Sequence, residues 1–191
     1  MKVLEYPNPA EINAALVRPA DDQAVERRAK VAGMLSAIRT EGDAALRRFA
    51  QQFDGFAAET FEVSEDEFVA AERLISPELK AAIRQAYANI RLFHQSQKEG
   101  IRVVETMPGV VCWRKSVAIE KVGLYVPGGT APLFSTVLML GIPAQIAGCQ
   151  EIVLCTPPQP DGSVHPAMLF SARLCGIERV FKIGGVQAIG A

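Results

Sequence analysis

Two polar side chains able to hold a ligand lie next to glycine pairs in the sequence. Tyr125 precedes the loop Pro127–Thr130, and Gln187 closes the loop Gly184–Gln187. A tyrosine ring can stack on a flat heterocycle while its hydroxyl forms hydrogen bonds, and a glutamine amide offers both donors and an acceptor. Both positions are therefore candidate ligand contacts. For Tyr125, a packed core aromatic is the alternative interpretation.

Each of these loops carries a Gly-Gly pair directly after a short apolar run. Glycine lets the backbone approach a ligand closely, and the N-terminus of a following helix favours an anion such as a pyrophosphate. Neither loop matches the G-x-G-x-x-G pattern of dinucleotide-binding turns. The glycines leave two interpretations open, namely ligand contacts or simple tight strand-to-helix turns.

No catalytic or metal centre is evident in the residue pattern. H-E-x-x-H, P-loop and paired-carboxylate motifs are missing, and the sequence has only two histidines, His94 and His165. The cysteines are irregularly spaced without a C-x-x-C pair: Cys112, Cys149, Cys155 and Cys175. A zinc site that combines the last three of them with His165 matches no familiar ligand spacing, so we reject it. We assign no catalytic and no metal-binding residue.

The elements that position the glycine loops alternate between strand and helix. Apolar, β-branched runs at Val122–Val126, Ile152–Cys155 and Val180–Ile183 recur about every 30 residues, the length of one βαβ unit. Helical segments are expected between them at Pro132–Ala147 and Pro166–Cys175, with a kink or division at Pro143. Continuous apolar strands predict a parallel sheet buried on both faces.

In such a sheet, ligands bind beyond the carboxyl ends of the strands. Three loops are expected at that edge: Pro127–Thr130, Thr156–Val164 and Gly184–Gln187. A half-sheet of three strands would also leave one strand edge without a partner.

The first part of the chain differs in character. Only eight of the 41 charged residues lie after residue 115, and the preceding segments have helical periodicity. Ser64 and Glu67 have the spacing of a capping box, and Ser76 is a predicted N-cap. The segment Ile101–Lys115 is expected to be extended or a hairpin. We predict a mainly helical region over residues 1–105 and an α/β domain over residues 106–191.

Composition excludes several classes of protein. The 191 residues are 49% apolar with a formal net charge of −1, so a core can form and no basic stripe for nucleic acid is present. No apolar run is long enough to predict a membrane span, and the N-terminus lacks the apolar region of a signal peptide. We therefore expect a cytoplasmic protein that binds neither nucleic acid nor membrane.

Long segments of the sequence resemble the histidinol dehydrogenase family. They are "VGLYVPGGTAPLFSTVLMLGIPAQIAGCQEIVLCTPP", "LCGIERVFKIGGVQAIGA" and, nearer the N-terminus, "EGDAALRRFAQQFDG" and "AAIRQAYANIRLFHQSQ". The resemblance implies an incomplete Rossmann-like domain and a homodimer. It also implies an NAD-dependent, zinc-requiring enzyme that oxidises L-histidinol through the aldehyde to L-histidine, the last step of histidine biosynthesis.

The resemblance also assigns roles to the two residues introduced above. Tyr125 in "GLYVPGG" and Gln187 in "GGVQAIGA" match positions that contact NAD in that family. The family's acid/base pair and zinc ligands match no residue of this sequence and are expected beyond residue 191. On this interpretation the chain is an N-terminal fragment that is inactive alone and binds NAD weakly or undetectably.

Two other interpretations remain open. The chain could be a naturally short, non-catalytic module that binds a nucleotide or a partner protein, in which case obligate oligomerisation would be expected. It could also belong to a dehydrogenase of the same family that acts on a different alcohol. The mass of the protein from its natural source separates the fragment from the short module.

Overall fold

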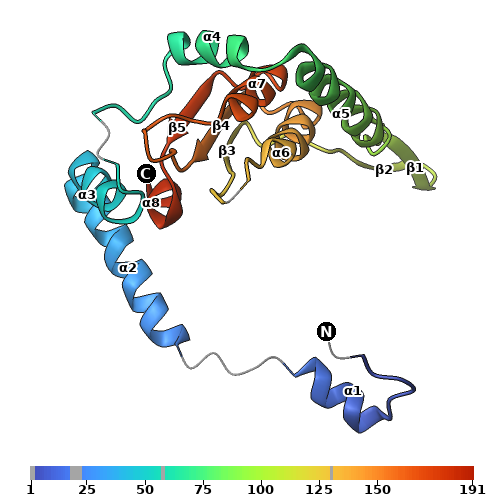
Figure 1. Cartoon of the computed structure of the whole chain (residues 1–191). Coiled ribbons are helices and arrows are strands. Elements are labelled where there is room, and N and C mark those ends of the chain that lie inside the picture. The colour runs from blue at the N-terminus through green and yellow to red at the C-terminus, as the bar shows by residue number, and fades with distance from the viewer. Residues whose placement is uncertain (1–2, 18–22, 57–58, 130) are drawn as a thin grey trace.

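The computed structural model describes residues 3–17, 23–56, 59–129 and 131–191. A mixed α/β fold follows, in which helices precede a parallel sheet with interleaved helices (Figure 1). In chain order the elements are α1 (Pro9–Leu16), α2 (Ala24–Glu41), α3 (Asp43–Phe53), α4 (Glu65–Leu74), α5 (Pro77–Gln95), β1 (Arg102–Met107), β2 (Val110–Arg114), β3 (Lys121–Tyr125), α6 (Phe134–Ala147), β4 (Glu151–Thr156), α7 (Pro166–Leu174), β5 (Arg179–Lys182) and α8 (Gly185–Gly190).

The predicted parallel sheet is confirmed, with strand order β3-β4-β5. Tyr125 pairs with Cys155, and Cys155 in turn pairs with Phe181 across the central strand. All three strands therefore end at the same edge. The loops that follow them are brought side by side, as the sequence predicts.

One face of the sheet packs into a continuous apolar core. Leu154 and Val180 point into this face and are fully buried. Helices α6 and α7 cover it, and α4 and α5 pack outside them against α7 and α6 (Figure 1). Since residues of α4 and α5 share this core with the sheet, the division of the chain near residue 105 stays a prediction about its folding units.

The opposite face is covered less completely. Cys155 and Phe181 point to this side and contact a small cluster of Ile38, Leu46 and Ile183, supplied by α2, α3 and the residue after β5. Helix α8 also packs here, against α2 and α3. A cavity of about 730 Å³ remains beside the cluster, lined by residues that include Gly123 and Val153.

The two edges of the sheet differ. The outer edge of β5 is paired by a short extended segment, in which Val63 N–H donates to the Val180 carbonyl at 2.8 Å and Lys182 N–H donates to the Phe61 carbonyl at 2.7 Å. Among the described residues, no strand pairs with the outer edge of β3. The unpartnered edge expected from the sequence is therefore the β3 edge.

Several helix boundaries follow from local chemistry. Ser64 and Glu67 form the predicted capping box at the start of α4, and the Ser76 hydroxyl accepts from Leu79 N–H at the start of α5. Gly148 ends α6 in the left-handed conformation at φ 94°. Pro143 does not divide α6, which continues to Ala147. Pro143 lies inside the helix, which therefore loses the one i→i−4 hydrogen bond that proline cannot donate.

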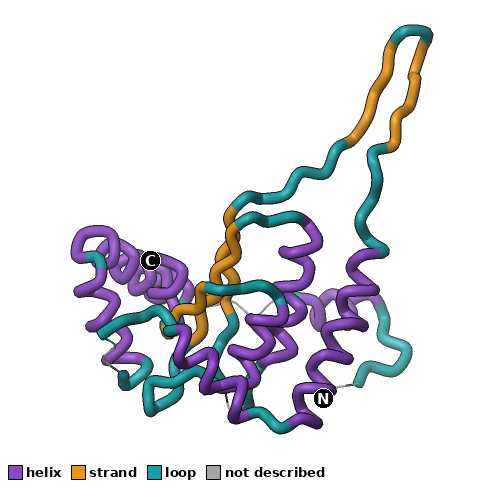
Figure 2. Tube along the Cα trace, turned by 90° about the horizontal axis from the view of Figure 1, so that it is seen from above, coloured by secondary structure: helices purple, strands orange, loops and turns teal. Residues whose placement is uncertain are grey.

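The predicted hairpin over Ile101–Lys115 is confirmed as the antiparallel pair β1-β2, which extends away from the body (Figure 2). Every residue of both strands is exposed, including Trp113 at 63%. Helix α1 also has no buried residue. No described helix is long and apolar enough to cross a membrane.

Candidate functional site

Three loops meet at the carboxyl edge of the sheet, and Pro157 lies at their centre. A Cβ placed on Gly128 would lie 2.7 Å from Pro157 Cγ, and one placed on Gly184 would lie 2.7 Å from Pro157 Cβ. Real Cβ atoms do not approach other atoms this closely, so both positions require glycine for loop packing. These two glycines are therefore explained without a ligand. Thr130 of the first loop lies outside the described residues.

The other two glycines of the pairs differ from each other. Gly185 has a positive φ of 59°, a conformation that favours glycine. Gly129 has no positive φ, is exposed, and would place a Cβ in open space with no atom within 4 Å. Gly129 is the member of the two pairs that neither packing nor backbone conformation accounts for.

Tyr125 is half-buried at the end of β3, and its hydroxyl accepts a hydrogen bond from Gly185 N–H at 2.9 Å. The side chain therefore spans from the first strand of the sheet to the turn after the third. Because this amide is already bonded to tyrosine, it is not free to bind an anion. The tyrosine hydroxyl keeps its own proton for donation to another group.

Gln187 is 1% exposed, so it does not project from the edge of the sheet. Its Nε2 donates to Asp54 Oδ2 at 3.3 Å. The structure thus brings the predicted residues Tyr125 and Gln187 to one turn, where each holds a different part of it. The role of Tyr125 and Gln187 toward NAD stays a prediction.

Asp54 is the residue of this site that the sequence did not indicate. It follows the last residue of α3, 133 positions before Gln187, and nothing in the local sequence links the two. Burial raises the pKa of the Asp54 carboxyl, and hydrogen bonds from the Gln187 side chain and the Gly184 backbone partly oppose that rise. A spatial contact of this kind becomes visible only in the folded chain.

A cavity of about 450 Å³ lies between the first two loops at this edge. Gly129 and Pro157 line it, together with His165 at the start of α7. The His165 Nδ1 accepts from Ala167 N–H at 3.2 Å and so caps the helix. The walls of this cavity are largely proline, glycine and aliphatic side chains, with polar groups from Thr156, Gln159 and His165. Apolar walls with a few polar groups suit a heterocycle better than a charged group.

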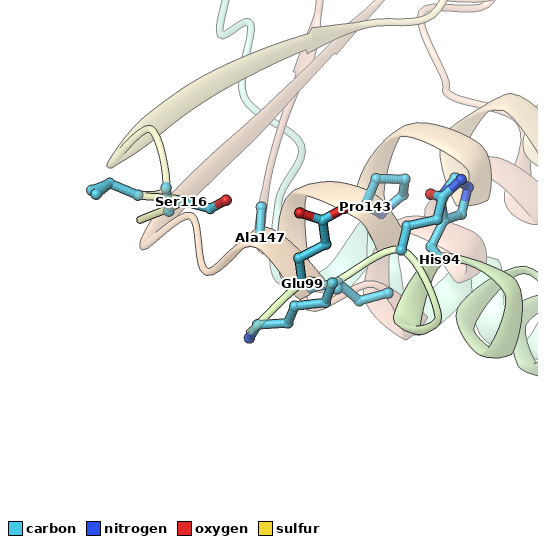
Figure 3. A pocket seen from close by; sticks show the side chains of 10 residues that line it. His94, Glu99, Ser116, Pro143 and Ala147 are labelled. Carbon is cyan, nitrogen blue, oxygen red and sulfur yellow. The ribbon is translucent and has the colours of Figure 1, made fainter. Parts of the chain in front are cut away.

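A second cavity, of about 330 Å³, lies at the opposite end of the sheet (Figure 3). His94 and Glu99 line it, with Ser116, Pro143 and Ala147. His94 Nδ1 lies 2.7 Å from Gln97 Oε1, which gives the ring a local partner. Nowhere in the described part of the chain do three His, Cys, Asp or Glu side chains gather as a metal ion requires.

Comparison with known proteins agrees with this architecture. The family model described as histidinol dehydrogenase matches residues 17–191 of this chain. The chain belongs to the histidinol dehydrogenase family. A histidinol dehydrogenase from Xanthomonas axonopodis pv. citri (strain 306) is 52% identical over 193 residues, and one from Bacteroides thetaiotaomicron is 51% identical over 192 residues.

The crystal structure of histidinol dehydrogenase from Elizabethkingia anophelis superimposes with a TM-score of 0.88 at 47% identity. It covers 97% of this chain but only 42% of its own length is matched. The Xanthomonas and Bacteroides histidinol dehydrogenases are matched over 45% and 44% of their lengths, each with 100% of this chain. The chain therefore spans less than half the length of the relatives it matches.

Proposed function

We propose that the complete protein to which this chain belongs is an NAD-dependent L-histidinol dehydrogenase, and that these residues carry part of its NAD site. The overall reaction oxidises the alcohol of L-histidinol to the aldehyde and then, after addition of water, to the carboxylate of L-histidine, with one hydride passed to NAD in each step. The observation that carries the proposal is family membership along nearly the whole chain, at 52% identity to one relative.

The carboxyl edge of the sheet supports the cofactor part of the proposal. Gly129 offers an exposed backbone with no steric or conformational reason for glycine, beside a cavity lined by apolar loops. Tyr125, half-buried at the same edge, keeps a hydroxyl proton to donate. An open glycine, a largely apolar cavity wall and a polar tyrosine are suitable contacts for a dinucleotide.

Zinc, which the family resemblance implies, has no suitable ligand group among the described residues. We therefore assign the metal, the acid/base pair and most substrate contacts to no residue of this chain. What these residues contribute is the binding and orientation of NAD at the sheet edge.

A homodimer is part of the same proposal. The exposed hairpin β1-β2 presents several large apolar side chains, among them Val103, Met107 and Trp113, each at least 60% exposed. An exposed apolar surface of this kind is typical of a contact with another chain. The mass in solution by light scattering, measured on the complete protein, tests for two copies.

The decisive assay follows NADH at 340 nm, using the complete protein as its source organism makes it. With L-histidinol as substrate we expect two NADH per L-histidine formed. Tyr125→Phe removes only the hydroxyl and is expected to raise the KM for NAD several-fold. Tyr87→Phe is the matched control, because that hydroxyl lies in a separate contact between α5 and α6, at 3.2 Å from Gln145 Oε1.

Two results would contradict the proposal. Binding of NAD without any oxidation of L-histidinol would favour the non-catalytic module, and oxidation of a different alcohol would favour a related dehydrogenase. Loss of activity in Tyr87→Phe equal to that in Tyr125→Phe would show that the assay reports general damage instead of cofactor binding.

A further inference from the structure

The Gly184–Gly185 turn is held from outside the sheet by a single carboxylate. Asp54 lies at the end of α3, which packs next to α8 (Figure 1). Helix α3 is fixed in this place by Leu46, which is buried with Ile183 just before the turn. The N-terminal helical region thus contributes to the proposed NAD site at the carboxyl edge of the sheet.

The Asp54 carboxylate contacts the helix that follows the turn and the turn itself. Gln187 Nε2 donates to Oδ2 at 3.3 Å, and the Gly184 backbone amide lowers the pKa of the same carboxyl. A Cβ on Gly184 would lie 3.2 Å from Asp54 Oδ1, so this position leaves little room for a side chain. Gln187 and Gly184 are both buried, so the loss of these contacts is costly.

These contacts fix which way the Gln187 amide points. A carboxylate only accepts, so the NH₂ group must face Asp54 and the carbonyl oxygen Oε1 must face the other way. Oε1 accordingly lies over Gly185, where it would be 2.9 Å from a Cβ on that residue. Gly185 N–H is meanwhile bonded to the Tyr125 hydroxyl. The orientation of Gln187 and the placement of Tyr125 therefore depend on the same turn.

We propose that Asp54 is a positioning residue of the cofactor site, which holds the Gln187 amide and the Gly184–Gly185 turn in the arrangement that receives NAD. This inference rests on the proposed function, because it concerns the same site. Asp54 acts through Gln187 and the turn and does not itself touch the ligand.

The alternative is that Asp54 only stabilises the fold. Both roles predict a lower melting temperature for Asp54→Ala, so stability alone does not separate them. Three readouts separate the two roles. They are the side-chain NMR signal of Gln187, the KM for NAD compared with kcat, and the coupling between the effects of substitutions at positions 54 and 187 on that KM. Asp43→Asn is the control, since Asp43 begins the same helix and pairs with Arg47 on the surface, away from the turn.

The experiment uses the complete protein, with ¹⁵N labelling for the NMR part. In the wild type we expect Gln187 to give a dispersed side-chain NH₂ pair with slow hydrogen exchange, assigned by its loss in Gln187→Ala. Asp54→Ala should move this pair to the shifts of a free glutamine. It should also raise the KM for NAD about tenfold, the loss typical of one hydrogen bond to a charged group, with kcat changed less than twofold. Asp54→Glu should recover part of the affinity.

The double variant gives the sharpest outcome. If Asp54 acts through Gln187, then Asp54→Ala should have little further effect on the KM for NAD in the Gln187→Ala background. Independent, multiplicative effects would overturn the inference, as would an unmoved Gln187 signal or a KM equal to that of the wild type. A wild-type protein that does not bind NAD would instead overturn the proposed function and this inference together.

Discussion

The two Gly-Gly loops of this chain look alike in sequence and differ in structure. In the second loop, Gly184 is packed against Pro157 and Asp54, and Gly185 has a positive φ and donates to Tyr125. In the first loop, Gly128 packs against Pro157 but Gly129 faces open space. Packing or backbone conformation accounts for both glycines of the second loop, whereas the first loop has one glycine that neither explains.

This difference shows that a glycine motif can serve packing and binding at adjacent positions. The glycine count alone would give both loops the same role. Only the surroundings of each missing Cβ separate a glycine needed by its neighbours from one available to a ligand. The predictions below test that separation, from the largest expected effect on stability to the smallest.

Gly184→Ala should destabilise the fold most. Its Cβ would approach Pro157 Cβ to 2.7 Å and Asp54 Oδ1 to 3.2 Å, and proline cannot move aside without moving its backbone. We expect a loss of about 3 kcal/mol in the free energy of unfolding, the upper end of the range for overpacking. Chemical denaturation measures it, and a loss below about 0.5 kcal/mol would show that the loop contact is soft.

Gly128→Ala should lower the free energy of unfolding by about 1–2 kcal/mol. The close contact of the new Cβ is with Pro157 Cγ alone, at 2.7 Å, while Pro157 Cβ lies at 3.7 Å. Pro157→Ala removes Cγ and retains Cβ, so it should rescue Gly128→Ala. It should not rescue Gly184→Ala, whose contact is with Cβ. Equal rescue of both variants would contradict the assigned geometry.

The contact of the second loop with Asp54 should make the stability of the protein slightly dependent on pH. Among the described residues of the first loop, none has such a contact with Asp54. The pKa of Asp54 is raised above its ordinary value, so its contribution to stability is fully present below the unfolded pKa and is lost as pH rises through the folded pKa. Relative to Asp54→Asn, the free energy of unfolding of the wild type should fall by less than about 1 kcal/mol as the pH rises above about 4. Urea titrations across that range measure the difference, and a wild type that gains stability there would contradict the sign.

Gly129→Ala should have the smallest effect on folding. With open space around its Cβ and no positive φ, alanine fits and restricts the unfolded chain. The free energy of unfolding should stay unchanged or rise by up to about 1 kcal/mol. A clear loss of stability would mean that Gly129 is a packing glycine like its neighbour.

Much of the fold could be predicted from the sequence because it depends on local chemistry. The apolar runs and their spacing predict the parallel sheet, and Ser64 with Glu67 predicts where α4 begins. The hairpin over Ile101–Lys115 also follows from local pattern. The pairing of Phe61 and Val63 with β5 could not be predicted, since it joins segments more than 100 residues apart through backbone hydrogen bonds that leave no pattern in the sequence.

The site was predicted less completely for the same reason. The place of Tyr125 and Gln187 after the strands indicates both residues, and the resemblance to a family implies their role. Asp54 is 133 residues from its partner and Pro157 acts by its shape, so neither has a sequence signal. The buried state of Gln187 was also not predicted, because a glutamine at a helix start is ordinarily exposed.

The most direct test of the account is the dissociation constant for NAD of the complete protein carrying Gly129→Ala, measured by calorimetry beside the wild type. Gly184→Ala serves as the packing comparison, measured at a low temperature at which this variant stays folded. If the free glycine is where NAD approaches the backbone, binding should weaken about tenfold while the unfolding transition is unchanged. Equal affinity of Gly129→Ala and wild type would contradict the claim that NAD approaches the backbone at Gly129.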